Sequence, residues 1–349
     1  MEHELYKVKQ LPVFQNRMYD TAEAAQKCPC GDMHLVQNHD TGLIYNAAFQ
    51  PELMIYDSNY QNEQAVSSLF IKHLGAVAEI VERTMGRQEL VEVGCGKGTF
   101  LEMLKNRGCD ITGFDPTYEG KNPRVRRHYF EAGVDITARG LILRHVLEHV
   151  QDPMKFLYAL RDANRGEGLI YIEVPCFDWI IKHRAWFDIF YEHANYFRLT
   201  DFERMFGHIV TSGRLFGDQY IYVVADLSTL RYPTASAEAL VKLSSDFAAV
   251  IGAEDASEKS AVIWGGASKG VIFALLRARI GQPVSRVIDI NPAKQGKYLP
   301  ATGLRVESPE VALADLPLGS AIYVMNSNYL QEIREITNNA YRYIGVDRD

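Results

Sequence analysis

The sequence predicts an α/β protein in which two doubly wound parallel sheets follow one another behind a small irregular or β-rich N-terminal module. Residues 90–115 have the pattern of a buried strand, a glycine turn, a helix and a second strand. Residues 261–290 repeat this order around a second glycine-rich turn. Because strands that alternate with helices form parallel sheets, each stretch predicts its own sheet.

The length of 349 residues exceeds that of one typical domain. Residues 1–58 contain turn formers and little helical periodicity, which predicts the N-terminal module. We expect the first α/β domain at residues 59–232 and the second at residues 233–349.

Hydrophobic periodicity, together with residues that break helices and strands, predicts the following helices and strands in chain order. In the first domain we expect helices at 60–85, 153–165 and 203–206, and strands at 141–144, 169–174 and 219–225. The link is expected to contain a long helix over 237–251. In the second domain we expect strands at 261–264, 284–290 and 321–325, and a helix from Tyr329.

The composition is that of an ordinary soluble globular protein, with 47% hydrophobic and 23% charged residues. A net charge of −7 argues against nucleic acid or anionic membrane as partner and favours a small molecule. The chain has no apolar run of bilayer length and begins without a signal-like segment, so we expect a cytoplasmic protein. Five scattered cysteines predict reduced thiols. The oligomeric state stays open.

The glycine turn at residues 94–98 has the features of a nucleotide site. Gly94, Gly96 and Gly98 permit positive φ and close approach of a ligand, and the following helix offers unpaired amides. Asp115 lies where a second parallel strand would end, and its carboxylate suits a ribose diol. A dinucleotide fingerprint would need glycine at position 99, where this chain has threonine, so NAD is disfavoured. With Glu92 before it, the loop resembles the S-adenosylmethionine loop of class I methyltransferases.

Three further blocks resemble the sugar C-methyltransferase-like family, which uses S-adenosylmethionine on nucleotide-linked deoxy-keto-sugars. The blocks lie at residues 60–67, at 187–197, and at 264–270 together with 289–300. The resemblance implies a class I methyltransferase sheet, then a Rossmann-like domain, with S-adenosylmethionine as cofactor and a substrate cleft between them. The implied substrate is a small molecule, a nucleotide sugar.

The resemblance also implies three groups of site residues. The catalytic group is Tyr191, Glu192 and His193. The cofactor group is Glu92, Gly94, Gly96, Gly98, Asp115, Pro116 and His145. The substrate group is Tyr60, Asn195, Tyr196 and Lys269.

Methylation of carbon needs a base, because carbon is a poor nucleophile until it is deprotonated. His193 titrates near working pH, and Glu192 can orient it or serve as the base itself. The alternative is that both belong to an ion-pair cluster on an aromatic segment. For Tyr60 the alternative is core packing, and for Asn195 and Tyr196 it is local turn bonding.

Lys269 lies in the second glycine-rich turn, where it can meet a diphosphate. The alternative is a tight turn that only packs helix on sheet.

The chain departs from the family at two places. A second Cys-x-x-Cys pair of the family's N-terminal zinc ribbon would fall at Asn38 and Thr41, which supply no thiolate. We therefore predict no metal, although Cys28, Cys30, His34 and His39 offer an alternative set. Phe190 stands where the best defined members have tyrosine, which leaves the acceptor atom open. An O- or N-methyltransferase and a non-catalytic S-adenosylmethionine-binding protein are the alternatives.

The run from His145 to His149 matches a zinc-peptidase signature, His-x-x-Glu-His. It follows a predicted buried strand and has no recognisable distal ligand. We therefore interpret it as a loop that lines the cofactor pocket.

Overall fold

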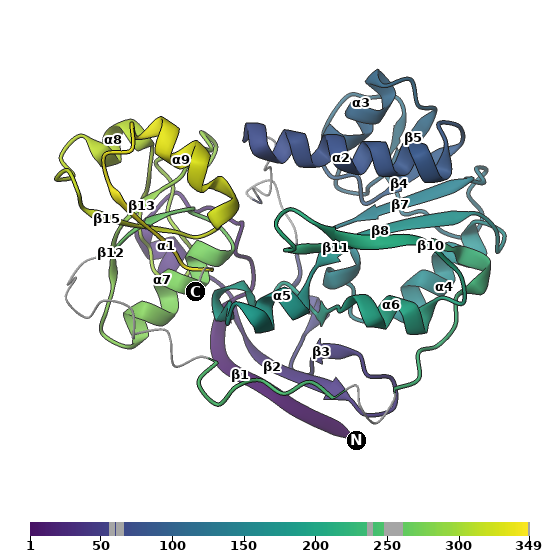
Figure 1. Ribbon diagram of the computed structural model, residues 1–349, viewed down its shortest axis with the longest axis horizontal. Helices are drawn as coiled ribbons and strands as arrows, with labels where there is room; N and C mark the ends of the chain where they lie inside the picture. The colour runs from purple at the N-terminus through teal and green to yellow at the C-terminus, as the bar shows by residue number, and fades with distance from the viewer. Residues whose placement is uncertain (56–59, 61–65, 236–239, 248–260, 348–349) are drawn as a thin grey trace.

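The computed structural model describes residues 1–55, 60, 66–235, 240–247 and 261–347. Figure 1 shows two lobes side by side, the first α/β domain on the right and the C-terminal domain on the left, with N-terminal strands along the lower side. A continuous apolar core joins the parts, and it includes Leu35, Leu141 and Phe273. At the junction, the rings of Trp186 and Phe273 stack with centroids 5.6 Å apart.

The N-terminal module is a small antiparallel sheet that joins both domains. Its strands are β1 (Glu2–Pro12), β2 (Cys30–Asn38), β3 (Ile44–Asn46) and β9 (Asn195–Tyr196), in the order β1-β2-β3-β9. The short helix α1 (Ala22–Gln26) lies between β1 and β2. Tyr19 exchanges backbone hydrogen bonds of 3.2 and 2.9 Å with Tyr298 of the C-terminal domain. The predicted β-rich module is confirmed.

The first α/β domain contains a seven-stranded sheet in the order β10-β11-β8-β7-β4-β5-β6. Its strands are β4 (Leu90–Val93), β5 (Ile111–Phe114), β6 (Val125–Arg126), β7 (Gly140–Arg144), β8 (Leu169–Pro175), β10 (Ile209–Leu215) and β11 (Tyr220–Asp226). Strands β4 to β8 pair in parallel, and β11 is antiparallel to both β8 and β10. The predicted doubly wound sheet is confirmed.

The helices of this domain are α2 (Ser68–Met85), α3 (Thr99–Asn106), α4 (Pro153–Ala163), α5 (Phe177–Lys182) and α6 (Leu199–Met205). Helix α2 begins at a capping serine, because the Ser67 hydroxyl accepts the N–H of Phe70, and it ends before Gly86 at φ 80°. Among the helices that the structure describes, none combines the length and the apolar character needed to cross a membrane.

The C-terminal domain is a parallel sheet in the order β14-β13-β12-β15-β16. Its strands are β12 (Ala261–Trp264), β13 (Val284–Ile288), β14 (Val306–Glu307), β15 (Ala321–Val324) and β16 (Arg342–Gly345). Its helices are α7 (Lys269–Arg279), α8 (Pro309–Leu313) and α9 (Leu330–Ile336). This arrangement confirms the second, Rossmann-like domain.

The helix predicted over 237–251 is wrong where it can be compared. Residues 240–247 form irregular chain and a turn, and the remainder of that range lies outside the described residues. The backbone N–H of Val241 donates to Gln37 Oε1 at 2.8 Å, and the ring of Phe247 packs on Tyr6 at 5.7 Å. Contacts with the N-terminal sheet therefore override the local helical pattern.

Candidate active site

The loop after β4 turns at three glycines that adopt positive φ. The angles are 71° at Gly94, 54° at Gly96 and 80° at Gly98. A Cβ atom at Gly94 would lie 2.6 Å from Val146 Cγ2, whereas nothing lies within 4 Å of one at Gly96. Gly94 and Gly96 line a cavity of about 390 Å³. The loop therefore presents main-chain atoms that a ligand can approach.

Asp115 follows β5 and braces the same loop. Its buried carboxylate accepts hydrogen bonds of 2.8 Å from the backbone N–H of Gly96 and 2.8 Å from that of Thr117. Pro116, the next residue after Asp115, is exposed. Gly98, Asp115 and Pro116 are not among the described residues that line the cavity. Asp115 thus lies at the edge of the loop, and its contact with a ribose remains a proposal.

Glu92 lies in β4, beneath the loop, with a buried side chain that lines the cavity. Burial raises the pKa of Glu92 to about 8, and nearby Arg144 opposes the rise only in part. Within the described residues, Glu92 Oε2 has no hydrogen-bond partner. Since an unpaired buried oxygen is costly, this position suits a ligand that donates a hydrogen bond.

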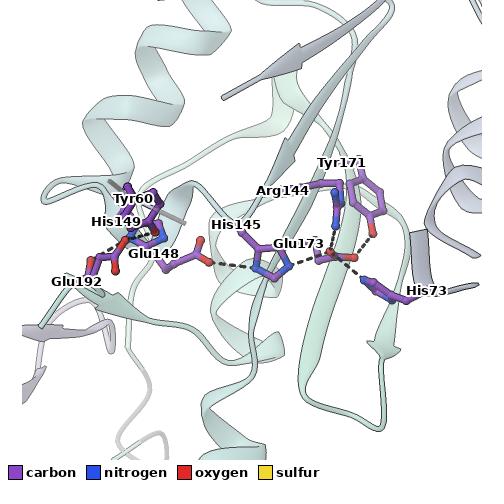
Figure 2. Close-up of polar contacts among 9 residues, drawn as sticks. All are labelled: Tyr60, His73, Arg144, His145, Glu148, His149, Tyr171, Glu173 and Glu192. Atoms are coloured by element: carbon purple, nitrogen blue, oxygen red, sulfur yellow. Dashed lines mark hydrogen bonds and ion pairs between the residues drawn. The ribbon is translucent and has the colours of Figure 1, made fainter. Parts of the chain in front are cut away.

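Figure 2 shows a buried polar network centred on Glu173, in β8. Its Oε1 lies 3.1 Å from Arg144 Nη2, 3.1 Å from His145 Nε2 and 3.3 Å from His73 Nε2, and its Oε2 accepts the Tyr171 hydroxyl at 2.9 Å. Burial alone would raise the pKa of Glu173, but Arg144 and the two histidines outweigh it and hold the pKa well below its usual range. The network therefore keeps a negative charge next to the cavity wall.

His145 connects this network to the cavity. Its φ is 51°, which a non-glycine residue adopts only where its surroundings hold it. Its Nδ1 lies 3.3 Å from Glu148 Oε1, while its Nε2 faces Glu173. Desolvation lowers the pKa of His145, but the contacts with these two carboxylates outweigh it and raise the pKa to about 9. Both ring nitrogens thus face protein carboxylates, so a cofactor contact here would use the ring face or the backbone.

Glu192 and His193 both line the cavity, although they are adjacent in the chain. They lie between the turn η3 (Trp186–Asp188) and β9 in a turn rather than a strand, which lets neighbouring side chains face one site. The Tyr60 hydroxyl donates to Glu192 Oε1 (Figure 2). Burial raises the pKa of Glu192 and lowers that of His193 well below its usual value. His193 is therefore neutral near pH 7.

Tyr191, Asn195 and Tyr196 do not line the cavity among the described residues. The Tyr191 hydroxyl accepts the backbone N–H of Gln50 at 2.7 Å. The Asn195 amide donates to the carbonyl of Val150. The Tyr196 hydroxyl bonds the backbone of residue 190 at 3.0 and 3.1 Å. In this structure, these side chains shape the segment that carries Glu192.

Lys269 begins α7 at the cavity wall and connects the two domains. Its Nζ lies 3.2 Å from Asp188 Oδ2, 3.1 Å from Gln219 Oε1 and 4.5 Å above the Trp179 ring. All three partners belong to the first α/β domain. The ammonium is therefore already matched by a carboxylate, so a diphosphate would have to compete with or add to that pair.

Several residues at or beside the cavity were not selected from the sequence. They include Asn16, Glu148, His149, Glu173 and Asp188. Glu148 and His149 lie in the His-x-x-Glu-His run, which the sequence predicts to line the cofactor pocket, although it assigns neither side chain a role. An acid near the end of a parallel strand is a signal that could have found Glu173. No signal marks Asn16, which reaches the cavity from the N-terminal module.

The strand order, with β11 antiparallel beside the edge strand, is that of a class I methyltransferase. The glycine loop lies at the carboxyl end of the central strand β4, where open α/β sheets bind ligands. The fold and the loop thus define the class of protein.

Comparisons with known proteins agree with this class. The model of a methyltransferase domain matches residues 67–209, and that of the C-methyltransferase C-terminal domain matches residues 224–345. The C-methyltransferase NovU of Streptomyces niveus is 23% identical over 343 residues, covering 84% of this chain and 81% of that protein. The ubiquinone biosynthesis O-methyltransferase of Ruegeria pomeroyi is 31% identical over 103 residues, 25% of this chain and 41% of that protein.

Among solved structures, the plantazolicin methyltransferase BpumL in complex with SAH has a TM-score of 0.37 and 14% identity, over 48% of this chain and 87% of that one. These matches show an S-adenosylmethionine-dependent methyltransferase whose residues 224–345 are similar to the C-methyltransferase C-terminal domain. Its cofactor is S-adenosylmethionine. The open backbone at Gly96 and the unpaired Glu92 oxygen fit this cofactor.

Proposed function

We propose that this enzyme methylates a carbon next to the ketone of a nucleotide-linked keto-deoxysugar. The observation that carries the proposal is the cavity between the two domains, since the glycine loop, Glu192 and His193 face it from one domain and Lys269 from the other. Its volume of about 390 Å³ is in the range of small-molecule sites. The similarity to NovU along most of the chain supports a carbon acceptor.

S-adenosylmethionine supplies an electrophilic methyl group when it is bound. We assign its binding to Glu92, the loop at residues 94–98, and Asp115 with the adjacent Pro116, and a contact at His145. The loop amides and the Asp115 carboxylate would hold polar groups of the nucleoside, and Glu92 would accept from an ammonium.

The acceptor carbon has to lose a proton before it can attack. We assign the base to the Glu192–His193 pair, because both groups face the cavity and burial raises the pKa of Glu192, which makes its carboxylate more basic, while it keeps His193 neutral. The base takes the proton, and the electron pair of the C–H bond moves into an enolate. The Tyr60 hydroxyl donates a hydrogen bond to Glu192 and so adds a further polar group beside the proposed base.

The substrate is proposed to extend toward Lys269 and the second glycine-rich turn. Tyr191, Asn195 and Tyr196 would act by holding the wall rather than by contact, as their internal bonds suggest. The division into residues 1–58, 59–232 and 233–349 also stays a proposal. The location in the cytoplasm also stays a proposal. The absence of nucleic acid and membrane partners is proposed as well, and the net charge of −7 supports it.

An isotope experiment tests the enolate. The protein is incubated in heavy water with a nucleotide-linked keto-deoxysugar and S-adenosylhomocysteine, and deuterium beside the ketone is measured by NMR. We expect exchange in the parent protein and a loss of turnover of about 10² to 10⁴-fold when the base is removed. No exchange, with the methyl group found on oxygen in a turnover assay, would favour O-methylation, which the limited match to a ubiquinone O-methyltransferase makes the alternative.

A further inference from the structure

Three metal-ligating side chains meet on the cavity wall: Glu148, His149 and His193. One ligand atom of each lies within 4.8 Å of those of the other two. Glu148 and His149 come from the turn η2 (Leu147–His149), and His193 comes from the turn before β9. Across the described part of the chain, this is the one group of such residues close enough to share a cation.

The protein already orients two of these groups as it would orient metal ligands. His149 Nδ1 lies 3.0 Å from the carbonyl oxygen of Glu192, which only accepts, so Nδ1 carries the proton and Nε2 has a free lone pair when the ring is neutral. Glu148 Oε1 faces His145 Nδ1 at 3.3 Å. Ligating histidines and carboxylates are typically held by such bonds to backbone and side-chain groups.

Two buried polar atoms of the cluster, and one of the neighbouring Glu192, lack partners. Glu148 Oε2, Glu192 Oε2 and His193 Nδ1 are buried and form no hydrogen bond with any described residue. The exposed fractions of these three residues are 1%, 0% and 6%. His149 Nδ1 lies at an ion-pair distance of 3.8 Å from Glu192 Oε1, which is too far for a hydrogen bond and leaves Glu192 Oε2 unpaired. Such unpaired buried groups call for a missing partner.

We propose that Glu148, His149 and His193 bind a divalent transition-metal cation. Two imidazoles and a carboxylate suit Zn²⁺, Mn²⁺ or Fe²⁺ better than they suit Ca²⁺, which takes oxygen ligands. Three protein ligands leave open positions toward the cavity, as in catalytic rather than structural sites. The ligands differ from the peptidase-like pair His145 and His149, because His145 contacts Glu148 and is not itself a ligand.

This inference deepens the proposed function and rests on it for the identity of the acceptor. When bound, the cation would act as a Lewis acid toward the ketone oxygen of the substrate. Glu192 would accept the proton of the adjacent C–H bond, and the electron pair of that bond would move into the enolate. His193 is then a ligand, and Glu192 is the base of the pair.

Binding is tested first, with the untagged full-length protein freed of metal by chelator and titrated with MnCl₂ alone. Electron paramagnetic resonance follows free Mn²⁺, and calorimetry repeats the titration with ZnCl₂. We expect one saturable site and at least tenfold weaker binding in Glu148→Gln and in His193→Asn. His128→Gln, an exposed histidine, and Tyr60→Phe should bind as the parent does. Circular dichroism identifies any variant that fails to fold.

No saturable binding, or binding that His193→Asn and Glu148→Gln leave unchanged in folded protein, overturns the site. Deuterium exchange in the presence and absence of metal then separates the two proposals. Deuterium exchange that requires Mn²⁺ supports both the role of the cation and the enolate mechanism. Exchange that is equally fast in metal-free protein overturns the role of the cation but leaves the enolate mechanism in place. A site that binds Mn²⁺ without any exchange keeps the metal and overturns the enolate.

Discussion

The two α/β domains use the same backbone device for their first loop but surround it with different groups. In the first domain, Asp115 accepts the N–H of Gly96 at 2.8 Å. In the second, Asp289 accepts the N–H of Gly266 at 2.9 Å. Both carboxylates follow the next strand of their sheet, so an acid at that position braces the loop in each domain before any ligand is considered.

The surroundings of the two loops differ in polarity and in tightness. The buried Glu92 lies two residues before the first glycine of one loop, and Ile263 holds the same place in the other. Gly270 of helix α7 lies directly against the backbone of the second loop. The residue at the same distance from the first glycine in the other domain is Thr99 of α3, which is larger. The comparison teaches that the loop shape positions amides, while the side chains below it decide which ligand they can hold.

The largest effect is expected from Gly270→Ala, which tests the tightness of the second loop. A Cβ atom there would lie 1.9 Å from the carbonyl oxygen of Gly265. Because this contact is with backbone, we expect a loss of about 5 kcal/mol or more in the free energy of unfolding of the second domain. The matched substitution Thr99→Ala should cost less than about 1 kcal/mol. Urea denaturation measures both, and equal stability of the two variants would contradict the difference.

The buried acid below the first loop is tested by Glu92→Gln over a range of pH. In the folded protein the pKa of Glu92 is about 8, against 4.5 for the ordinary carboxyl, so folding retains a proton that the unfolded chain loses. The contribution of Glu92 to stability is therefore fully present below pH 4.5 and is lost as pH rises toward 8, by at most about 5 kcal/mol at about 1.4 kcal/mol per pKa unit.

Glutamine removes this slope, because it resembles the protonated acid. We expect the variant and the parent to have similar stability at pH 4.5. As pH rises to 8, the variant should become more stable relative to the parent. Thermal unfolding of the cofactor-free protein checks this. Parallel curves for the two proteins across that range would show that Glu92 is ionised in the fold.

The smallest effect is expected on cofactor affinity, when the two loop-bracing aspartates are replaced one at a time. Asp115→Ala should weaken S-adenosylmethionine binding by about 1 to 3 kcal/mol, the range for a hydrogen bond to a charged group. Asp289→Ala makes the same change in the second loop and should leave the affinity unaltered. Calorimetry of both variants decides, and an equal loss in both would mean that the cofactor site has been misplaced.

The sequence predicted both sheets, both loops and the β-rich module, because glycine positions and strand periodicity are local features. It failed for the segment 240–247, where Val241 and Phe247 are held by the N-terminal sheet. The catalytic role of Tyr191 and the substrate contact of Asn195 stay predictions, and a motif could not reveal that their side chains bond to Gln50 and Val150.

The sequence by itself determined the class of enzyme, because Gly94 to Gly98 and Asp115 are set by backbone geometry within one strand–helix–strand unit. Only the tertiary structure decided which side chains meet at the cavity. Tyr60 meets Glu192 across 132 positions of the chain, and His149 meets His193 by the packing of two turns. Such contacts depend on how sheets and domains pack, and no short-range pattern encodes that packing.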